Sequence, residues 1–163
     1  ALALCANPKL IIADEPTTAL DVSMQAQIIS LMKRLCRDHG TAVILVTHDM
    51  GVIAETAHRV CVMYAGRLVE IGPVREVAQN PKHPYTRGLM AAIPRMTAGD
   101  GPLAQIEGTM PRLDGVPAGC AFHPRCPRRF APCDQLLPLL QEVGPRHETA
   151  CHLYPESGQG GRR

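Results

Sequence analysis

The segment KLIIADEPTTALD, residues 9–21, determines how we interpret this chain. Its continuous apolar run, residues 10–13, is typical of a central parallel strand that is buried on both faces. Asp14 and Glu15 follow where that strand ends, and the carboxyl ends of strands are where open α/β sheets bind ligands. One acid there suits the Mg²⁺ that a nucleotide carries, and the second can polarise a water for attack on phosphorus. The segment therefore predicts phosphate chemistry at the edge of a parallel sheet.

A helix and a second strand complete this unit. Residues 22–38 have apolar side chains three and four positions apart, which predicts a helix that ends at Gly40. Residues 42–46 form a second apolar run, and a helical connection of this length implies parallel pairing of the two strands. His48 then falls at the same sheet edge as the two acids. A histidine at such a position can contact a γ-phosphate and orient the attacking water.

The same polar residues also have structural interpretations. Adjacent carboxylates such as Asp14 and Glu15 most often serve as solvated caps of a following helix, and Asp21 is placed to cap the helix that begins at Val22. His48 could be an ordinary hydrogen-bonded loop residue. Two strand ends with matching polar groups at one edge nevertheless favour a site.

The rest of the chain predicts shorter elements. The chain opens without Met inside apolar, helix-forming residues that Asn7-Pro8 interrupts, so we expect it to be a fragment of a longer protein. Further along we expect a helix at 51–56, a hairpin of strands at 59–64 and 67–71, a helix at 73–78 and a helix that ends near residue 93.

Composition limits the classes of function. At 163 residues and 45% hydrophobic content the chain can bury a core, and its formal net charge of +2 indicates neither a nucleic-acid nor a membrane surface. No apolar stretch approaches the roughly 18 residues that a membrane-spanning helix needs, and no signal peptide is visible. We therefore expect no nucleic-acid partner.

Four cysteines lie in a Gly- and Pro-rich region that follows residue 98. This region lacks sustained periodicity, so we expect it to need a staple other than an apolar core. Disulfides are disfavoured if this domain lies in the cytosol beside ATP. Zinc sites favour closer C-x₂₋₄-C pairs, a [4Fe–4S] cluster tolerates wider spacing, and unliganded thiols also stay open. We expect the remaining thiols, Cys5, Cys36 and Cys61, to be buried and the nearby His123, His147 and His152 to be surface residues. The four candidate ligands are Cys120, Cys126, Cys133 and Cys151, with 5, 6 and 17 residues between them.

DEPTTALD followed by VTHD resembles the ATP-binding subunits of ABC transporters. The resemblance implies a Walker B strand in which Asp14 holds Mg²⁺ through water and Glu15 is the general base. It also implies a D-loop whose Asp21 reaches the partner nucleotide site, with His48 as the switch histidine. The G-x-x-x-x-G-K-[ST] loop and the LSGGQ-like segment, which precede Walker B in this family, do not occur in these 163 residues. We therefore expect the chain alone neither to bind ATP tightly nor to hydrolyse it.

Other segments are similar to one branch of that family. HPYTRGLMAAIPR (83–95) and GCAFHPRCPRRFAPC (119–133), with Cys151, resemble the C-terminal extension of oligopeptide/dipeptide transporter ATPases, and VMYAGRLVEIG (62–72) is typical of them. THDMGVIAE is closer to the D-type than to the F-type subunit. The resemblance implies that the four cysteines hold an iron–sulfur cluster, with zinc as the alternative. Nickel and glutathione importers share this architecture, so the substrate stays open.

These observations lead to one main hypothesis. We predict an α/β fold with a partial P-loop NTPase parallel sheet and flanking helices in residues 1–79. A small Cys-rich, loop-rich extension follows in residues 80–154 and a disordered tail in residues 155–163. The resemblance implies an ATP-hydrolysing subunit of a peptide importer, peripheral at the cytoplasmic face of the inner membrane. Its implied partners are a second ATPase subunit, two transmembrane permease subunits and, indirectly, an extracytoplasmic peptide-binding protein. The alternative function is a non-catalytic metal-binding or regulatory module.

Overall fold

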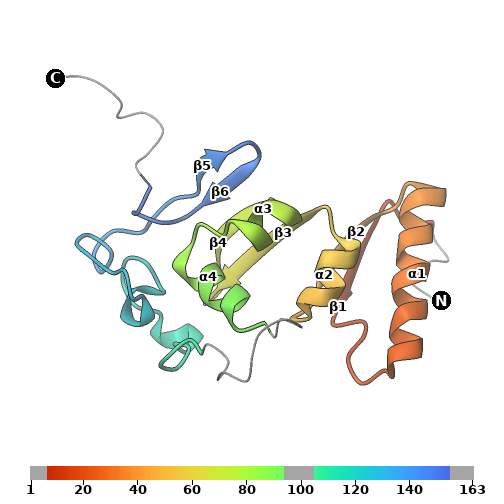
Figure 1. The fold of residues 1–163 in the computed structure, drawn as a ribbon, viewed down its shortest axis with the longest axis horizontal. Helices are drawn as coiled ribbons and strands as arrows, with labels where there is room; N and C mark the ends of the chain where they lie inside the picture. Colours follow the sequence, from red (N-terminus) through yellow and green to blue (C-terminus); the bar gives the residue numbers. More distant parts are fainter. Residues whose placement is uncertain (1–6, 94–104, 155–163) are drawn as a thin grey trace. The chain divides into compact units, whose positions relative to one another are not determined.

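The computed structural model describes residues 7–93 and 105–154, and these divide between Ala57 and His58 into two compact units (Figure 1). Both units combine helices with strands, which confirms the α/β class. The predicted helix end at residues 1–6 and the predicted disordered tail lie outside the described residues. None of the helices in the described ranges has the length and apolar character that crossing a membrane requires.

The first unit has the predicted order of strand, helix, strand and helix. β1 (Leu10–Asp14) pairs in parallel with β2 (Ala42–Val46), and α1 (Val22–His39) connects them. α2 (Met50–Thr56) follows the second strand. Gly40 ends α1 in the left-handed conformation, with φ of 63°, as a glycine after a helix commonly does. The period of the apolar residues therefore predicted this unit almost to the residue.

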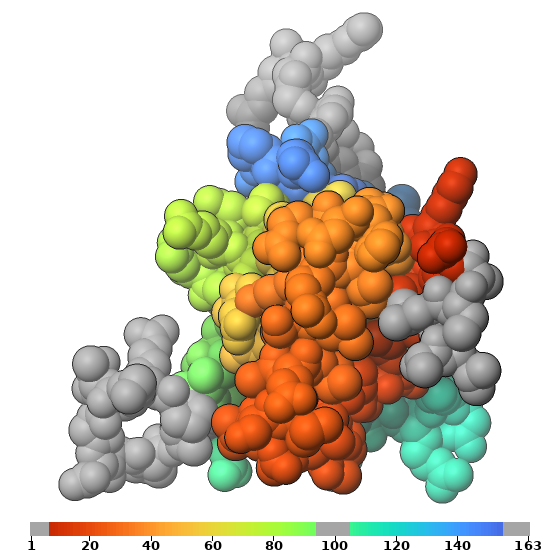
Figure 2. Space-filling model, turned by 90° about the vertical axis from the view of Figure 1, so that its right-hand side faces the viewer, coloured from red at the N-terminus to blue at the C-terminus, as the bar shows by residue number. Residues whose placement is uncertain are grey.

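The burial of these strands differs from the prediction. The exposed fractions of Leu10 and Ile12 are 49% and 68%, and Ile44 and Val46 of β2 are similarly exposed. Alternate residues of a strand point to opposite faces, so one face of this two-stranded sheet is open among the described residues. In α1 the buried apolar side chain is Ile29. Figure 2 looks onto this helix, coloured red to orange.

The second unit is built on an antiparallel sheet with the strand order β3-β4-β6-β5. The predicted hairpin is confirmed, although its second strand and the following helices begin or end a few residues from the predicted positions. The hairpin near the end of the chain was not predicted, because we expected only loops there. The elements are β3 (Arg59–Tyr64), β4 (Arg67–Pro73), α3 (Val74–Gln79), α4 (Pro84–Ala91), the 3-10 turns η2 (Leu113–Gly115) and η3 (His123–Arg125), β5 (Gln141–Gly144) and β6 (His147–Thr149).

An aromatic cluster forms the core of this unit. The ring of Tyr64 makes edge contacts with Tyr85 and Phe122, at centroid distances of 4.7 and 5.2 Å. Such pairs favour an edge-to-face arrangement because of the charge distribution of the rings. Phe122 lies in the Cys-rich region, so this region does contribute to an apolar core, contrary to our expectation. Two thiols that we expected to be buried, Cys36 and Cys61, are exposed.

The sheet joins segments from both sides of residue 79. β4 pairs with β6, Glu70 opposite Thr149 and Ile71 opposite Glu148, so the last strands of the chain extend the hairpin of its middle part. The division between an ATPase part and an extension at residues 79 and 80 stays a prediction.

Candidate functional site

Glu15 and His48 meet at the carboxyl edge of the parallel strands. β1 and β2 pair in register, with Asp14 opposite Val46, so the residues that follow the two strands leave the sheet side by side. The N–H of Glu15 donates to the carbonyl of Val46 at 2.8 Å. Nδ1 of His48 lies 2.7 Å from Oε1 of Glu15 and donates to this carboxylate. The structure thus brings together two of the predicted site residues.

The turn after β1 holds the other side of the Glu15 carboxylate. Thr18 donates from its hydroxyl to Oε2 of Glu15 at 2.9 Å and from its N–H to the carbonyl of Glu15 at 3.1 Å. Glu15 and Ala19 both have left-handed backbones, with φ of 46° and 62°. This conformation is unfavourable for residues that have a Cβ, and such strain concentrates at functional sites. The turn therefore holds a carboxylate in a fixed position at the sheet edge.

The contact also shifts the acid–base properties of both groups. The hydrogen bond from His48, followed by that from Thr18, lowers the pKa of Glu15. The same contact with Glu15 raises the pKa of His48. Glu15 is therefore ionised at neutral pH and can accept a proton or a hydrogen bond from a water molecule. The His48 side chain is 84% exposed, so solvent and a ligand can reach the pair.

A pH titration of His48 tests this geometry. Because the pKa of His48 is raised, the stabilisation from the charged pair is complete below the ordinary histidine value of about 6.5 and is lost as pH rises through the raised value. Because the pKa of Glu15 is lowered, its part is present above about 4.3 and is lost as pH falls through the lowered value. We expect NMR titration to give His48 a pKa above its ordinary value, and Glu15→Gln to return it there. A His48 pKa that does not respond to Glu15→Gln would contradict the contact.

The three aspartates near this pair have different positions. Asp14 is exposed at the end of β1. Asp21, a predicted nucleotide-site residue, accepts from the N–H of Met24 at 2.9 Å and so caps α1. Asp49 was missed by the sequence reasoning: its carboxylate caps α2 and accepts from Nε2 of Gln25 at 3.3 Å, which links the two helices. An aspartate directly before an apolar helix is the signal that could have found it.

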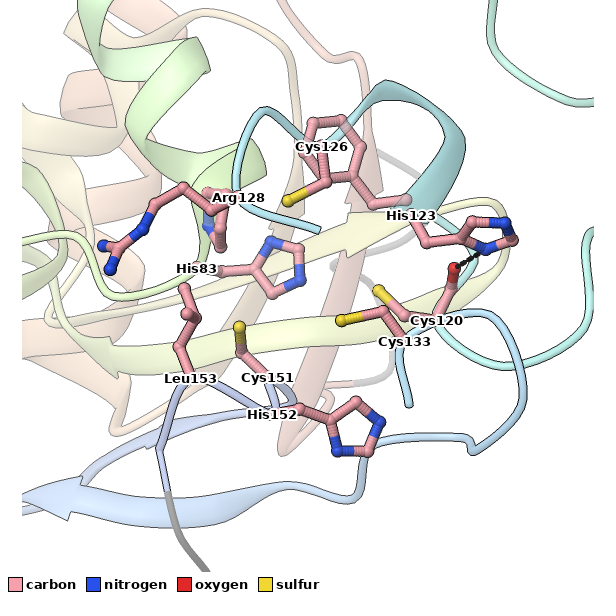
Figure 3. Close-up of a pocket in the computed structure, with 11 residues that line it drawn as sticks. His83, Cys120, His123, Cys126, Arg128, Cys133, Cys151, His152 and Leu153 are labelled. Atoms are coloured by element: carbon pink, nitrogen blue, oxygen red, sulfur yellow. Dashed lines mark hydrogen bonds between the residues drawn. The ribbon is translucent and has the colours of Figure 1, made fainter. Parts of the chain in front are cut away.

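The four predicted cysteine ligands line one small pocket in the second unit (Figure 3). Cys120 and Cys126 flank η3, Cys133 follows in a turn and Cys151 lies after β6. The N–H of Cys120 donates to the carbonyl of Cys133 at 2.8 Å. A Cβ at Gly119, which has φ of 68°, would lie 2.5 Å from that same carbonyl, so this close approach of two chain segments requires glycine. The fold therefore gathers all four thiols although they lie far apart in sequence.

The thiols of this pocket are largely removed from water. Burial raises the pKa of Cys120 and of Cys126, and it raises the pKa of Cys151 to about 11. Without a cation these thiols therefore stay protonated at neutral pH. A backbone N–H two residues further along the chain opposes the shift at each of them, and these amides belong to Phe122, Arg128 and Leu153.

The four thiols of the pocket are not placed as the ligands of a single metal ion. Among the residues that the structure describes, no group of three or more His, Cys, Asp or Glu side chains is placed to hold a metal ion. A single zinc ion needs four donors about 2.3 Å from one position. The four thiols share a pocket but are not arranged around one such position.

Two histidines of this region were assigned wrongly or overlooked. His147, which we expected at the surface, is 2% exposed and donates from Nε2 to Oε1 of Glu70 at 2.7 Å. Glu70 is fully buried and also accepts from the N–H groups of Lys82 and His83, each at 2.8 Å. A buried carboxylate needs such partners, and 77 residues separate Glu70 from His147, so no local pattern reveals the pair. His83 lines the cysteine pocket.

With both sites described, comparison with known proteins identifies the family. Residues 69–133 match the family model described as the C-terminal region of oligopeptide/dipeptide transporters. These residues belong to that family. The transporter C-terminal region thus includes β4, the aromatic cluster around Phe122 and three of the four pocket cysteines.

Individual relatives extend the similarity beyond the transporter C-terminal region. The oligopeptide transport ATP-binding protein AppD of Bacillus subtilis is 47% identical over 158 residues, which cover 97% of this chain and 48% of that protein. The dipeptide transport ATP-binding protein DppD of Bacillus subtilis is 45% identical over 159 residues, covering 98% of this chain and 48% of that protein. The oligopeptide transport ATP-binding protein OppD of Salmonella typhimurium is 47% identical over 151 residues, covering 93% of this chain and 45% of that protein. The chain spans about half the length of these relatives.

Proposed function

We propose that this chain forms the C-terminal half of the ATP-hydrolysing subunit of an ABC importer for dipeptides or oligopeptides. The observation that supports this most strongly is the hydrogen bond between Glu15 and His48 at the ends of neighbouring parallel strands. A water that attacks phosphorus needs a base and an orienting group at such an edge. The similarity to peptide-transport ATP-binding proteins agrees with this chemistry.

Each residue of the edge has a distinct role in this proposal. Glu15 is ionised and accepts the proton of the attacking water, while Thr18 and His48 fix its two oxygens. His48 also contacts the γ-phosphate from its other ring nitrogen. Asp14 binds the Mg²⁺ that accompanies ATP through a water molecule, which supplies charge neutralisation at the phosphates. Asp21 keeps α1 capped and, in the same position, reaches the nucleotide of a partner domain.

The remaining parts of the nucleotide site are proposed to come from a longer polypeptide. The phosphate-binding loop of such ATPases is absent from the sequence, and the chain matches only about half of each relative. Further helices of a P-loop NTPase domain would cover the exposed face of β1 and β2, where Leu10 and Ile12 lie, and further strands would pair with the edges of this sheet. The intact subunit pairs with a second ATPase subunit and drives two permease subunits from the cytoplasmic face of the inner membrane.

We propose that the cysteine pocket holds a structural [4Fe–4S] cluster, with zinc as the alternative. Its four thiols line one pocket, and a cluster binds each thiolate at a different iron. Backbone N–H groups oppose the rise in the pKa of three of the thiols, which favours thiolates. When bound, the cluster would supply the four bonds that cross-link these loops.

A chimera tests the proposed function. The part of the Bacillus subtilis dipeptide relative that precedes its match to this chain is fused to Ala1 and expressed in cells that lack this relative. We expect the chimera to restore uptake of a labelled dipeptide, because it combines a phosphate loop with Glu15 and His48. The chain without the added half is the control, and we expect it to restore no uptake and to bind ATP no more tightly than millimolar. A folded chimera that hydrolyses ATP but never moves a peptide would contradict the assignment to peptide import.

A further inference from the structure

The hydrogen bonds of His83 determine where its proton lies. Its Nδ1 accepts from the backbone N–H of Tyr85 at 3.1 Å and thereby caps the start of α4. A backbone N–H can only donate, so Nδ1 has no proton. A ring nitrogen that accepts is unprotonated, so the ring is neutral and its one proton must lie on Nε2.

That proton has no acceptor among the described residues. His83 is only 1% exposed, and its Nε2 is buried and makes no hydrogen bond to any described residue. Buried donors are nearly always satisfied, and an orphan of this kind needs an explanation. The ring lines the cysteine pocket, and Figure 3 shows it in the midst of the four cysteine side chains. The unsatisfied N–H therefore faces a place where sulfur atoms gather.

The surroundings prevent the ring from leaving this position. The main-chain N–H of His83 donates to Oε2 of Glu70 at 2.8 Å, and the second oxygen of Glu70 accepts from His147 and Lys82. The ring of Phe122 lies 5.8 Å from the His83 ring, between centroids. With its backbone anchored, its Nδ1 engaged and an aromatic ring beside it, His83 is a preorganised donor.

We propose that His83 donates an N–H···S hydrogen bond from Nε2 to the iron–sulfur group held by the four cysteines. It acts as a positioning and tuning residue and not as a ligand, because a nitrogen that keeps its proton has no lone pair for iron. Hydrogen bonds to the sulfurs stabilise the more negative, reduced state and raise the reduction potential. This inference rests on the cluster assignment made under the proposed function.

Two substitutions separate the roles of the two ring nitrogens. In His83→Asn the side-chain oxygen can replace Nδ1 as the cap of α4, but no donor reaches the pocket. In His83→Gln the longer side chain can place its amide N–H where Nε2 was, at the expense of the cap. The full chain is purified without oxygen, and iron content and the midpoint potential of the cluster are measured for all three proteins.

We expect His83→Asn to shift the reduction equilibrium about tenfold toward the oxidised cluster, which is about 59 mV for one electron, and His83→Gln to stay closer to wild type. We also expect His83→Asn to lose its cluster several times faster in air. Equal potentials in three iron-loaded proteins would overturn the hydrogen bond and leave the cluster in place. A wild-type chain without iron would overturn the cluster together with this inference, while the uptake test would be unaffected.

A measurement on the wild-type protein keeps the proposal testable if His83→Asn does not fold. With ¹⁵N-labelled histidine, pulsed EPR of the reduced cluster should detect a weakly coupled histidine nitrogen and a proton that exchanges in D₂O. A spectrum without histidine coupling would overturn the proposal. His123 and His152 also line the pocket, so His123→Gln and His152→Gln serve as matched controls and should retain the coupling.

Discussion

Replacing Glu15 with Gln in the chimera should lower the rate of ATP hydrolysis by about a hundredfold or more, while ATP still binds. Gln has nearly the same shape, so it can keep the contacts of Glu15 with Thr18 and His48. It cannot accept a proton from water at neutral pH. The loss should therefore fall on turnover and leave the nucleotide affinity within a few-fold of wild type, as measured by steady-state hydrolysis and nucleotide titration.

A second glutamate of the same unit provides the control. Glu55 of α2 forms a surface ion pair with Lys33 and is 62% exposed, and exposed pairs of this kind contribute little to stability. We expect Glu55→Gln to hydrolyse ATP at the rate of the unsubstituted chimera. If Glu15→Gln also kept that rate, Glu15 would not be the base and the proposed mechanism would be wrong.

Replacing Cys133 with Ser should remove the cluster from the full chain. The proposed cluster needs four thiolates, and a buried serine hydroxyl is a poor ligand for iron. We expect iron to fall from about four atoms per chain to less than one, together with the absorption near 400 nm that such clusters give. Because metal binding and folding are coupled, the thermal unfolding of the second unit should shift to lower temperature as well.

An exposed cysteine outside the pocket is the matched control for this change. Cys61 of β3 is exposed and does not line the pocket, so Cys61→Ser should keep its iron. A wild-type chain that is colourless and contains zinc would contradict the cluster and favour the zinc alternative. Iron that persists in Cys133→Ser would show that Cys133 is not a ligand.

The first unit could be predicted from the sequence because its determinants are local. The period of the apolar residues gave α1, and Gly40 and Asp21 mark its two ends. Parallel pairing then follows from the length of the connection, and it brings Glu15 and His48 to one edge. The exposed face of β1 was not predicted, since an apolar run does not reveal how many layers cover a strand.

The second unit depends on contacts between distant residues, so its organisation could not be predicted in the same way. The four cysteines could be identified because they lie together in a Gly- and Pro-rich region. The pairing of β4 with β6 and the buried contact between Glu70 and His147 could not, since they join segments about 77 residues apart. His83 is the first residue of the segment HPYTRGLMAAIPR, which the sequence analysis singled out. Its proposed role depends on the hydrogen bond at Nδ1, which fixes the position of its proton.

The most direct test of the central claim is the rate of labelled dipeptide uptake by cells whose only copy of this subunit is the chimera. The claim is that the half contributed by this chain completes an ATP-hydrolysing site for peptide import. We predict uptake with the unsubstituted chimera and with Glu55→Gln, and uptake at the level of cells without the subunit for Glu15→Gln. Equal uptake by the Glu15→Gln and unsubstituted chimeras would contradict the account.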